Sequence, residues 1–351
     1  MPLPNLPFRP IRGELYSPTE LLEGYHPENP LSYAETLDFQ IFRYFVITGR
    51  STPTDALASI MEALHDNSIT QGVLSFLLRQ ERVVAVMGGH DEERGSPSYR
   101  SVLKISRKLA LQGFLLASGG GPGAMEATHL GALLKASSDE EVDRAISALA
   151  VVKGLPPSSK VIGPDGDIDE SIVRLLHAWL LPAYEILCTV NSPGKSLGVP
   201  TWYYGHEPFT PLATHVAKYF QNSIREDGLL ALAAHGIVFA PGKAGTLQEI
   251  FQDAAQNYYH SVADRFSPMV FFGLDYWTKA LPIRVVLESL FKQNGREEEY
   301  QRLVLFTDDA DEAVQFLVDR ALSKRQLTER WKAVGLEAAL ERLEAEQRPP
   351  K

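Results

Sequence analysis

The sequence predicts an α/β fold in which a doubly wound parallel sheet carries helices on both faces. The first indication is a series of short apolar runs rich in β-branched residues, at 82–87, 114–118, 237–240, 269–273 and 303–307, as expected of buried parallel strands. The second is that helical spacing follows these runs, which gives the strand–helix alternation of such a sheet. The third is that the first three runs end in glycine-containing turns, which is typical of a ligand-binding crevice.

Length, net charge and cysteine content exclude several kinds of partner and site. The chain has 351 residues and a net charge of −10, which allows a substantial core and argues against a nucleic acid polymer as partner. Its single cysteine, Cys188, excludes an intramolecular disulfide and a cysteine-rich zinc site. The first residues lack the pattern of an export signal, and no apolar stretch approaches the roughly 20 residues of a membrane span. We therefore expect a cytoplasmic protein without a membrane partner, a metal site or a cofactor.

The pattern divides the chain into three parts. Residues 1–80 form an N-terminal appendage, residues 81–322 form the sheet domain, and residues 323–351 form a C-terminal helical tail. Within the sheet domain, residues 136–195 are treated as an insertion, which we expect to lie near the ligand crevice. The tail carries an apolar stripe between positions 327 and 343, which would pack on its own domain or on a second subunit.

Local patterns predict the less regular elements. Aromatic and β-branched residues at 39–47 predict a strand, whereas residues 52–55 predict the start of a helix. Extended segments are predicted at 149–152 and 184–190, and a long helix is predicted at 211–234.

Two glycine-rich loops stand between a strand and a helix. One reads Gly119-Gly120-Gly121-Pro122-Gly123, and the other reads Pro241-Gly242-Lys243-Ala244-Gly245-Thr246. Glycines allow close approach of the backbone, and the following helix presents free N–H groups at the positive end of its dipole, which suits a phosphate. The predicted phosphate- or nucleotide-binding residues are Gly88, Gly119, Gly120, Gly121, Gly123, Gly242, Lys243, Ala244, Gly245 and Thr246.

Glu249 follows the second loop by one helical turn, and two interpretations compete. In a capping box, Thr246 would be the N-cap and Glu249 the N3 residue, and spacing alone favours this structural role. Alternatively, the Glu249 carboxylate is catalytic, because the same turn places it beside the predicted phosphate site.

The second loop resembles a known family signature. The run Pro241-Gly242-x-x-Gly245-Thr246-x-x-Glu249 looks like the P-G-G-x-G-T-x-x-E signature of the Lonely Guy family. Members are Rossmann-like nucleoside 5′-monophosphate phosphoribohydrolases that were long mislabelled as lysine decarboxylases. The first loop is similar to the family's Gly-Gly-Gly turn. Lys243 stands where the signature has its second glycine.

A further motif of the family, M-H-x-R-K, is mostly absent. Arg225 matches its arginine, whereas Asn222, Ser223 and Glu226 occupy the other positions. The resemblance covers residues 82–320 with the insertion omitted, and it is specific mainly at the two glycine loops.

The resemblance implies hydrolysis of the N-glycosidic bond of a nucleoside 5′-monophosphate to a free base and ribose 5-phosphate. In this interpretation Glu249 is the catalytic carboxylate, Arg225 holds the phosphate or polarises the leaving base, and Lys243 adds charge to the phosphate site. The resemblance also implies a homodimer or higher homo-oligomer. A non-catalytic nucleotide sensor or carrier with the same loops remains the alternative, which Lys243 and the reduced second motif favour.

Decarboxylase chemistry is rejected, because no recognisable setting for a Schiff-base lysine appears. Arg100 and His206 are weaker candidates, for which a surface arginine and an ordinary loop histidine are the competing interpretations. The run His90-Asp91-Glu92-Glu93 is interpreted as a solvated loop, since consecutive residues do not converge on one metal ion.

Overall fold

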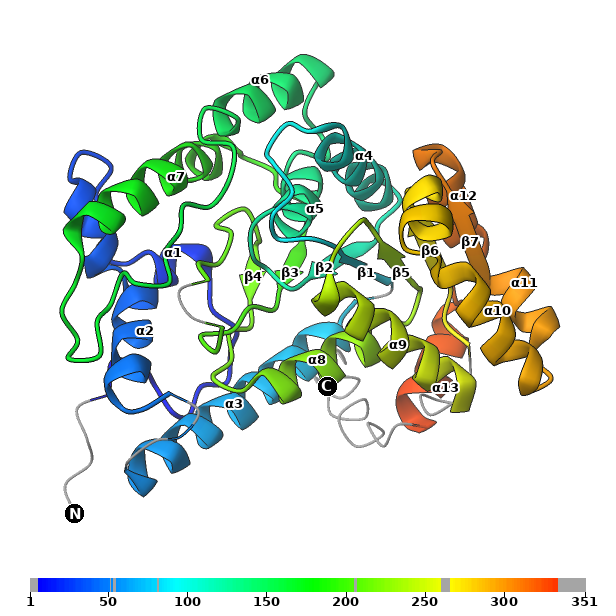
Figure 1. Ribbon diagram of the computed structural model, residues 1–351, viewed down its shortest axis with the longest axis horizontal. Helices are drawn as coiled ribbons and strands as arrows, with labels where there is room; N and C mark the ends of the chain where they lie inside the picture. Colours follow the sequence, from blue (N-terminus) through cyan, green and yellow to red (C-terminus); the bar gives the residue numbers. More distant parts are fainter. Residues whose placement is uncertain are drawn as a thin grey trace, which may run out of the picture.

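Seven parallel strands form a single sheet. The computed structural model describes residues 6–50, 52, 55–80, 82–204, 207–259 and 266–333. Within these ranges the strand order is β4-β3-β2-β1-β5-β6-β7 (Figure 1). The strands are β1 (Val83–Met87), β2 (Leu115–Ser118), β3 (Ser196–Gly198), β4 (His215–Val216), β5 (Ile237–Phe239), β6 (Met269–Phe272) and β7 (Val304–Thr307). This sheet confirms the predicted fold class.

The order of the strands reverses at β1. The chain proceeds outward from β1 through β2, β3 and β4, and then returns to the other side of β1 with β5, β6 and β7. All neighbouring strands are parallel, so their carboxyl ends share one edge of the sheet. In such sheets a crevice opens outside the carboxyl ends at the point of reversal. Here that point lies between β1 and β5.

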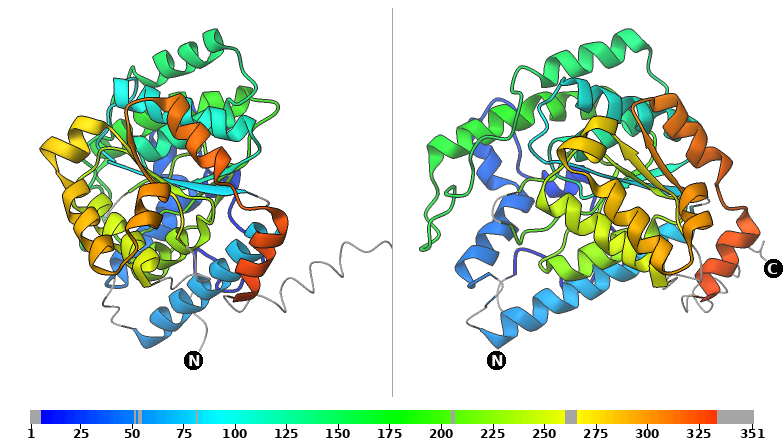
Figure 2. Two further views of the ribbon diagram at one scale, coloured as in Figure 1. Left: turned by 90° about the vertical axis from the view of Figure 1, so that its right-hand side faces the viewer. Right: turned by 45° about the vertical axis from the view of Figure 1, so that its right-hand side comes forward.

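Helices cover both faces of the sheet. Val84 and Val86 of β1 pack into one hydrophobic cluster, whereas Val83, Ala85 and Met87 pack into the other. The cluster on the first side includes residues of α4 (Pro97–Leu111), α5 (Ala124–Leu133), α6 (Asp139–Leu149) and α12 (Ala310–Asp319). The other includes residues of α8 (Asn222–Leu232), α9 (Ala244–Tyr259), α10 (Ile283–Gln293) and the N-terminal segment (Figure 2). The helix α7 (Glu170–Thr189) contributes to both clusters, with Val173 and Leu176 in this one and Ala183 and Ile186 in the first.

The N-terminal segment is helical and packs against the sheet domain. It contains α1 (Pro18–Leu21), the 3₁₀ helix η1 (Pro30–Glu35), α2 (Leu37–Ile47) and α3 (Ala56–Leu77), and α3 runs alongside α8 (Figure 1). The strand predicted at 39–47 is wrong. Thr36 caps α2 by accepting from the Phe39 N–H, and the buried rings of Phe39, Phe42 and Phe45 recur every third residue on one helical face. The helix predicted to begin after residues 52–55 is confirmed, with Asp55 as its N-cap.

The predicted insertion is also mainly helical. Leu149 is the last residue of α6 and residues 150–152 follow it, whereas most of residues 184–190 belong to α7, so the two extended segments predicted there are wrong. Length and apolar composition alone would allow α7 to cross a membrane. Its buried side chains, which include Val173, Leu176 and Trp179, lie on one face, and α7 packs against η1 and α6.

The long helix predicted at 211–234 is wrong in its first half. That stretch contains the two-residue strand β4, and α8 begins only at Asn222. Ala213, Val216 and Phe220 are buried because they lie in and around the edge of the sheet, and their helical spacing is incidental. A strand of two residues is too short to leave a recognisable period in the sequence.

The C-terminal part completes the domain. The π-helix η2 (Tyr276–Ala280), α11 (Glu297–Leu303) and α13 (Lys324–Ala333) follow β6 and β7. Leu327 and Trp331 of α13 are buried against Ala234 of the same chain, so the start of the predicted apolar stripe packs on its own domain. The rest of the stripe lies outside the described residues. The division of the chain into three parts remains a prediction.

Candidate functional site

The backbone of Gly89 joins the loops that follow β1, β2 and β5. Its N–H donates to the Pro241 carbonyl at 3.0 Å, and its carbonyl accepts from the Ala124 N–H at 3.0 Å. A Cβ atom on Gly123, which has a φ of 71°, would lie 2.4 Å from the Gly89 oxygen. Glycine is therefore required at position 123, and the three loops meet at the point where the strand order reverses.

The loop after β5 presents the start of α9. The Leu247 N–H donates to the Lys243 carbonyl at 3.0 Å, which makes Lys243 the residue that precedes the first helical turn. The N–H groups of Ala244, Gly245 and Thr246 therefore come before the first i to i−4 hydrogen bond of the helix. They form the positive end of the helix dipole. This is the geometry that binds a phosphate.

The hydrogen bond from Leu247 to Lys243 also tests the predicted capping box of Thr246 and Glu249. Thr246 lies within the first turn of α9, because the helix begins at Ala244. A residue inside the helix is not its N-cap, so the box predicted for Thr246 and Glu249 is wrong. A complete capping box is instead formed by Ser138 and Glu141 at the start of α6.

The loop after β2 is held in shape by buried hydrogen bonds. The Gly120 N–H donates to Ser118 Oγ at 3.1 Å, and Ser118 Oγ lies 2.8 Å from His129 Nε2. Burial lowers the pKa of His129 to about 3, so its imidazole is neutral. The N–H groups of Gly120 and Ala124 are already engaged inside the protein. Donors for a ligand would therefore come from the other residues of this loop and from the first turn of α5.

Arg225 and Glu249 meet beside these loops. Arg225 Nη1, on α8, lies 3.7 Å from Glu249 Oε1, on α9, and the two side chains are only 12% and 15% exposed. Arg225 Nε donates to Asn222 Oδ1 at 3.2 Å. A Cβ atom on Gly119 would lie 3.6 Å from Arg225 Nη1. The two residues predicted to be catalytic are thus adjacent to each other and to the first glycine loop.

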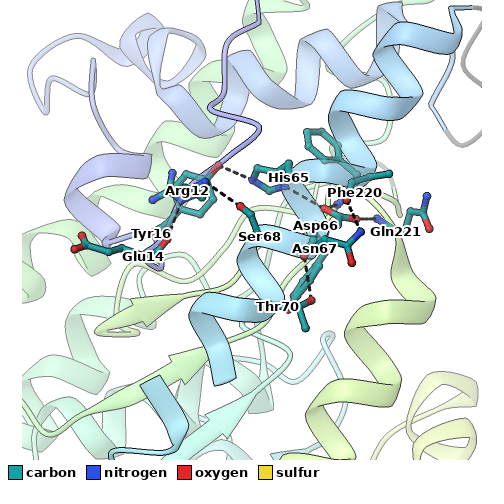
Figure 3. Close-up of polar contacts among 12 residues, drawn as sticks. Arg12, Glu14, Tyr16, His65, Asp66, Asn67, Ser68, Thr70, Phe220 and Gln221 are labelled. Carbon is teal, nitrogen blue, oxygen red and sulfur yellow. Dashed lines mark hydrogen bonds and ion pairs between the residues drawn. The ribbon is translucent and has the colours of Figure 1, made fainter. Parts of the chain in front are cut away.

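The start of α8, and with it Arg225, is held by α3 (Figure 3). Asp66 accepts from the Phe220 N–H at 3.0 Å and from the Gln221 N–H at 2.9 Å. Its Oδ1 also lies 3.1 Å from His65 Nδ1, and His65 Nε2 lies 2.8 Å from the Tyr16 hydroxyl. The side chains of Tyr16, His65 and Asp66 are all buried. The Tyr–His–Asp chain therefore has a structural role, since its carboxylate is committed to fixing the backbone that precedes α8.

The other predicted residues have different surroundings. Gly88 allows close packing, because a Cβ atom there would lie 2.7 Å from the Ala124 Cβ. Lys243 is exposed and forms an ion pair with Asp91, which connects the loops after β5 and β1. Arg100 forms an exposed ion pair with Asp143 at 2.6 Å. His206 lies outside the described residues.

Four residues that help to build the site were not identified from the sequence. They are Gly89, His129, Asn222 and Asp66. Asn222 had a detectable signal, because it precedes Arg225 by three residues on a helix and can reach it. Asp66 and His129 had no such signal. The partner of Asp66, Phe220, lies far away in the chain, and the partner of His129, Ser118, lies on the other side of the first glycine loop in the sequence.

Comparison with known proteins identifies no family. No family model matches the sequence, and neither does any curated protein. Among solved structures, the molybdenum cofactor binding protein of the phototrophic bacterium Rippkaea orientalis aligns at 12% identity and a TM-score of 0.38, covering 69% of this chain and 98% of the other. The Moco carrier protein of Chlamydomonas reinhardtii aligns at 15% identity and a TM-score of 0.38, covering 68% and 99%. Such similarity indicates no ligand, and membership of the family that the motif resembles stays a prediction.

Two glycine-to-alanine substitutions test the packing of the loop after β5. A Cβ atom on Gly242 would lie 2.1 Å from Thr246 Oγ1, whereas one on Gly245 would meet no heavy atom within 4 Å. We expect Gly242→Ala to lower the free energy of unfolding by about 1–3 kcal/mol through overpacking. Gly245→Ala should leave it unchanged or raise it by up to about 1 kcal/mol. Denaturant unfolding measures both, and equal stability of the two variants would contradict this description of the loop.

Proposed function

We propose that the protein binds a nucleoside 5′-monophosphate at the reversal point of the sheet and hydrolyses its N-glycosidic bond. The observation that carries this proposal is the Arg225–Glu249 pair, which is largely buried beside two glycine loops. Arg225 Nη1 and Glu249 Oε1 are 3.7 Å apart. A phosphate site next to a carboxylate is the minimum that this reaction requires, because the carboxylate must stand near C1′ while the phosphate anchors the ribose.

The reaction breaks the bond between C1′ and the base. As this bond weakens, C1′ gains positive charge, which the Glu249 carboxylate stabilises while it orients the attacking water. The water oxygen adds to C1′, its proton is removed, and the base leaves with the bonding electron pair and takes up a proton. The products are a free base and ribose 5-phosphate.

Arg225 and the loops supply the remaining roles. The free N–H groups at the start of α9 and in the first turn of α5 bind the phosphate oxygens. Arg225 lies between Glu249 and Gly119, from where its guanidinium contacts the phosphate or polarises the leaving base. Lys243, which is paired with Asp91, adds a positive charge at the outer side of the second loop.

A nucleotide carrier or sensor without turnover is the second candidate. The Lys243–Asp91 ion pair favours it, because it connects two of the loops around the crevice and would help to retain a bound ligand. Incubation of the protein with a panel of mononucleotides, followed by chromatography of the products, separates the two candidates. Free base and ribose 5-phosphate support the hydrolase, and tight binding without products supports the carrier.

Glu249→Gln tests the catalytic role of the carboxylate. The amide keeps the size of the side chain but cannot take up a proton or balance the charge at C1′, so we expect turnover to fall by on the order of 10²-fold or more. Nucleotide affinity should stay within a few-fold. The control is Glu288→Gln, which removes an exposed carboxylate from α10 and should not change turnover. Hydrolysis by Glu249→Gln at the parent rate would exclude Glu249 from the chemistry.

We also propose that the protein is a homodimer or a higher homo-oligomer. The family resemblance supports this proposal. A second support is the exposed apolar surface on α10, where Val285 and Val286 are 63% and 48% exposed. Light scattering at micromolar concentration should give at least twice the mass of one chain. A monomer under these conditions would remove this proposal.

A further inference from the structure

A cavity of about 480 Å³ lies between the N-terminal segment and the start of α8. It is formed by side chains of α2, α3 and the segments that follow β3 and β4, and its lining includes Arg50, Glu62, Tyr203, Tyr204, Asn222 and Ser223. Because Tyr203 and Asn222 follow strands of the parallel sheet, the cavity lies on the same edge as the glycine loops.

Glu62 is the most unusual group in this cavity. Its side chain belongs to α3 and is only 5% exposed, and its Oε1 atom has no hydrogen-bond partner within the described residues. The residue also lies one helical turn before Asp66, whose carboxylate is committed to the start of α8. Burial, and secondly the negative charge of Asp66, raise the pKa of Glu62 to about 7. A buried carboxyl group without a partner is costly, and a ligand that pairs with it removes this cost.

The cavity adjoins the proposed catalytic pair. Asn222 lines it, donates through Nδ2 to the Tyr204 hydroxyl at 2.7 Å, and accepts from Arg225 Nε at 3.2 Å. The Asn222 side chain therefore connects the lining of this cavity with Arg225. The Gln221 side chain, at the N-cap position of α8, makes no capping hydrogen bond.

We propose that this cavity binds the heterocyclic base of the nucleotide and that Glu62, as the neutral acid, pairs with a base edge that offers one donor beside one acceptor. This inference rests on the proposed function, because the phosphate of the same ligand occupies the glycine loops. A carboxylic acid presents one O–H donor and one carbonyl acceptor side by side. The amino group and ring nitrogen of adenine or cytosine complement this pair. The rings of Tyr203 and Tyr204 line the cavity and are partly exposed, so a planar base can stack on them.

The test compares two ligands that differ in the base. One is the carbocyclic analogue of AMP, which lacks the ring oxygen required for hydrolysis, and the other is ribose 5-phosphate, which has no base. Dissociation constants are measured by calorimetry at pH 6.0 and pH 8.0 for the parent protein, Glu62→Gln and Glu62→Leu. The ratio of the two affinities reports the contribution of the base to binding, because a change in the charge of the phosphate affects both ligands equally.

In the parent protein, the preference for the AMP analogue should fall about tenfold from pH 6.0 to pH 8.0, as Glu62 loses its proton. Glu62→Gln should keep the preference at both pH values, since an amide also offers one donor and one acceptor. Glu62→Leu should reduce the preference at pH 6.0 by on the order of tenfold and abolish its dependence on pH.

The outcomes separate this inference from the proposed function. If ribose 5-phosphate and the AMP analogue both fail to bind, the proposed function is wrong. If both bind, and the ratio of their affinities is the same in all three proteins, the base does not occupy this cavity. A preference for the AMP analogue that increases with pH would show that an ionised Glu62 is required, which also overturns the inference.

Discussion

The site depends on the close contact of three loops at the backbone of Gly89. Because the sheet is parallel and its order reverses between β1 and β5, the loops after these strands diverge to opposite faces. Gly89 connects them again, by donating to Pro241 and accepting from Ala124. This contact brings the starts of α5 and α9 to one place. Two helix dipoles and their free N–H groups then act on the same region, which is the physical basis for anion binding there.

The N-terminal segment contributes to the same edge of the sheet through buried carboxylates. Asp66 fixes the backbone that leads into α8, and Asp38 accepts from Trp202 Nε1 at 2.8 Å and forms a buried ion pair with Lys218 at 2.8 Å. A buried carboxylate is stable only when its oxygens are paired, so these contacts define one arrangement of the segment on the sheet. Arg225 and the cavity beside it thus depend on residues that the glycine motifs do not include.

The local parts of the structure could be predicted from the sequence. Buried strands such as Val83–Met87 leave continuous apolar runs, and a strand, glycine loop and helix in succession specify their own geometry. The rest depends on distant contacts. Residues 39–47 have strand-like composition but form a helix, because Thr36 caps it and the aromatic face packs on the core. The role of Thr246 was missed, since one hydrogen bond from Leu247 moves the helix start three residues earlier than the T-x-x-E pattern suggests.

A crystal structure of the protein with AMP would test most directly whether the reversal point of the sheet binds a mononucleotide. We expect the phosphate within hydrogen-bond distance of N–H groups at the start of α9 or of α5, and C1′ beside the Glu249 carboxylate. The contradictory result would be a phosphate bound elsewhere. One such place is the cavity at the opposite edge of the sheet, which Arg302, Arg320 and Arg330 line.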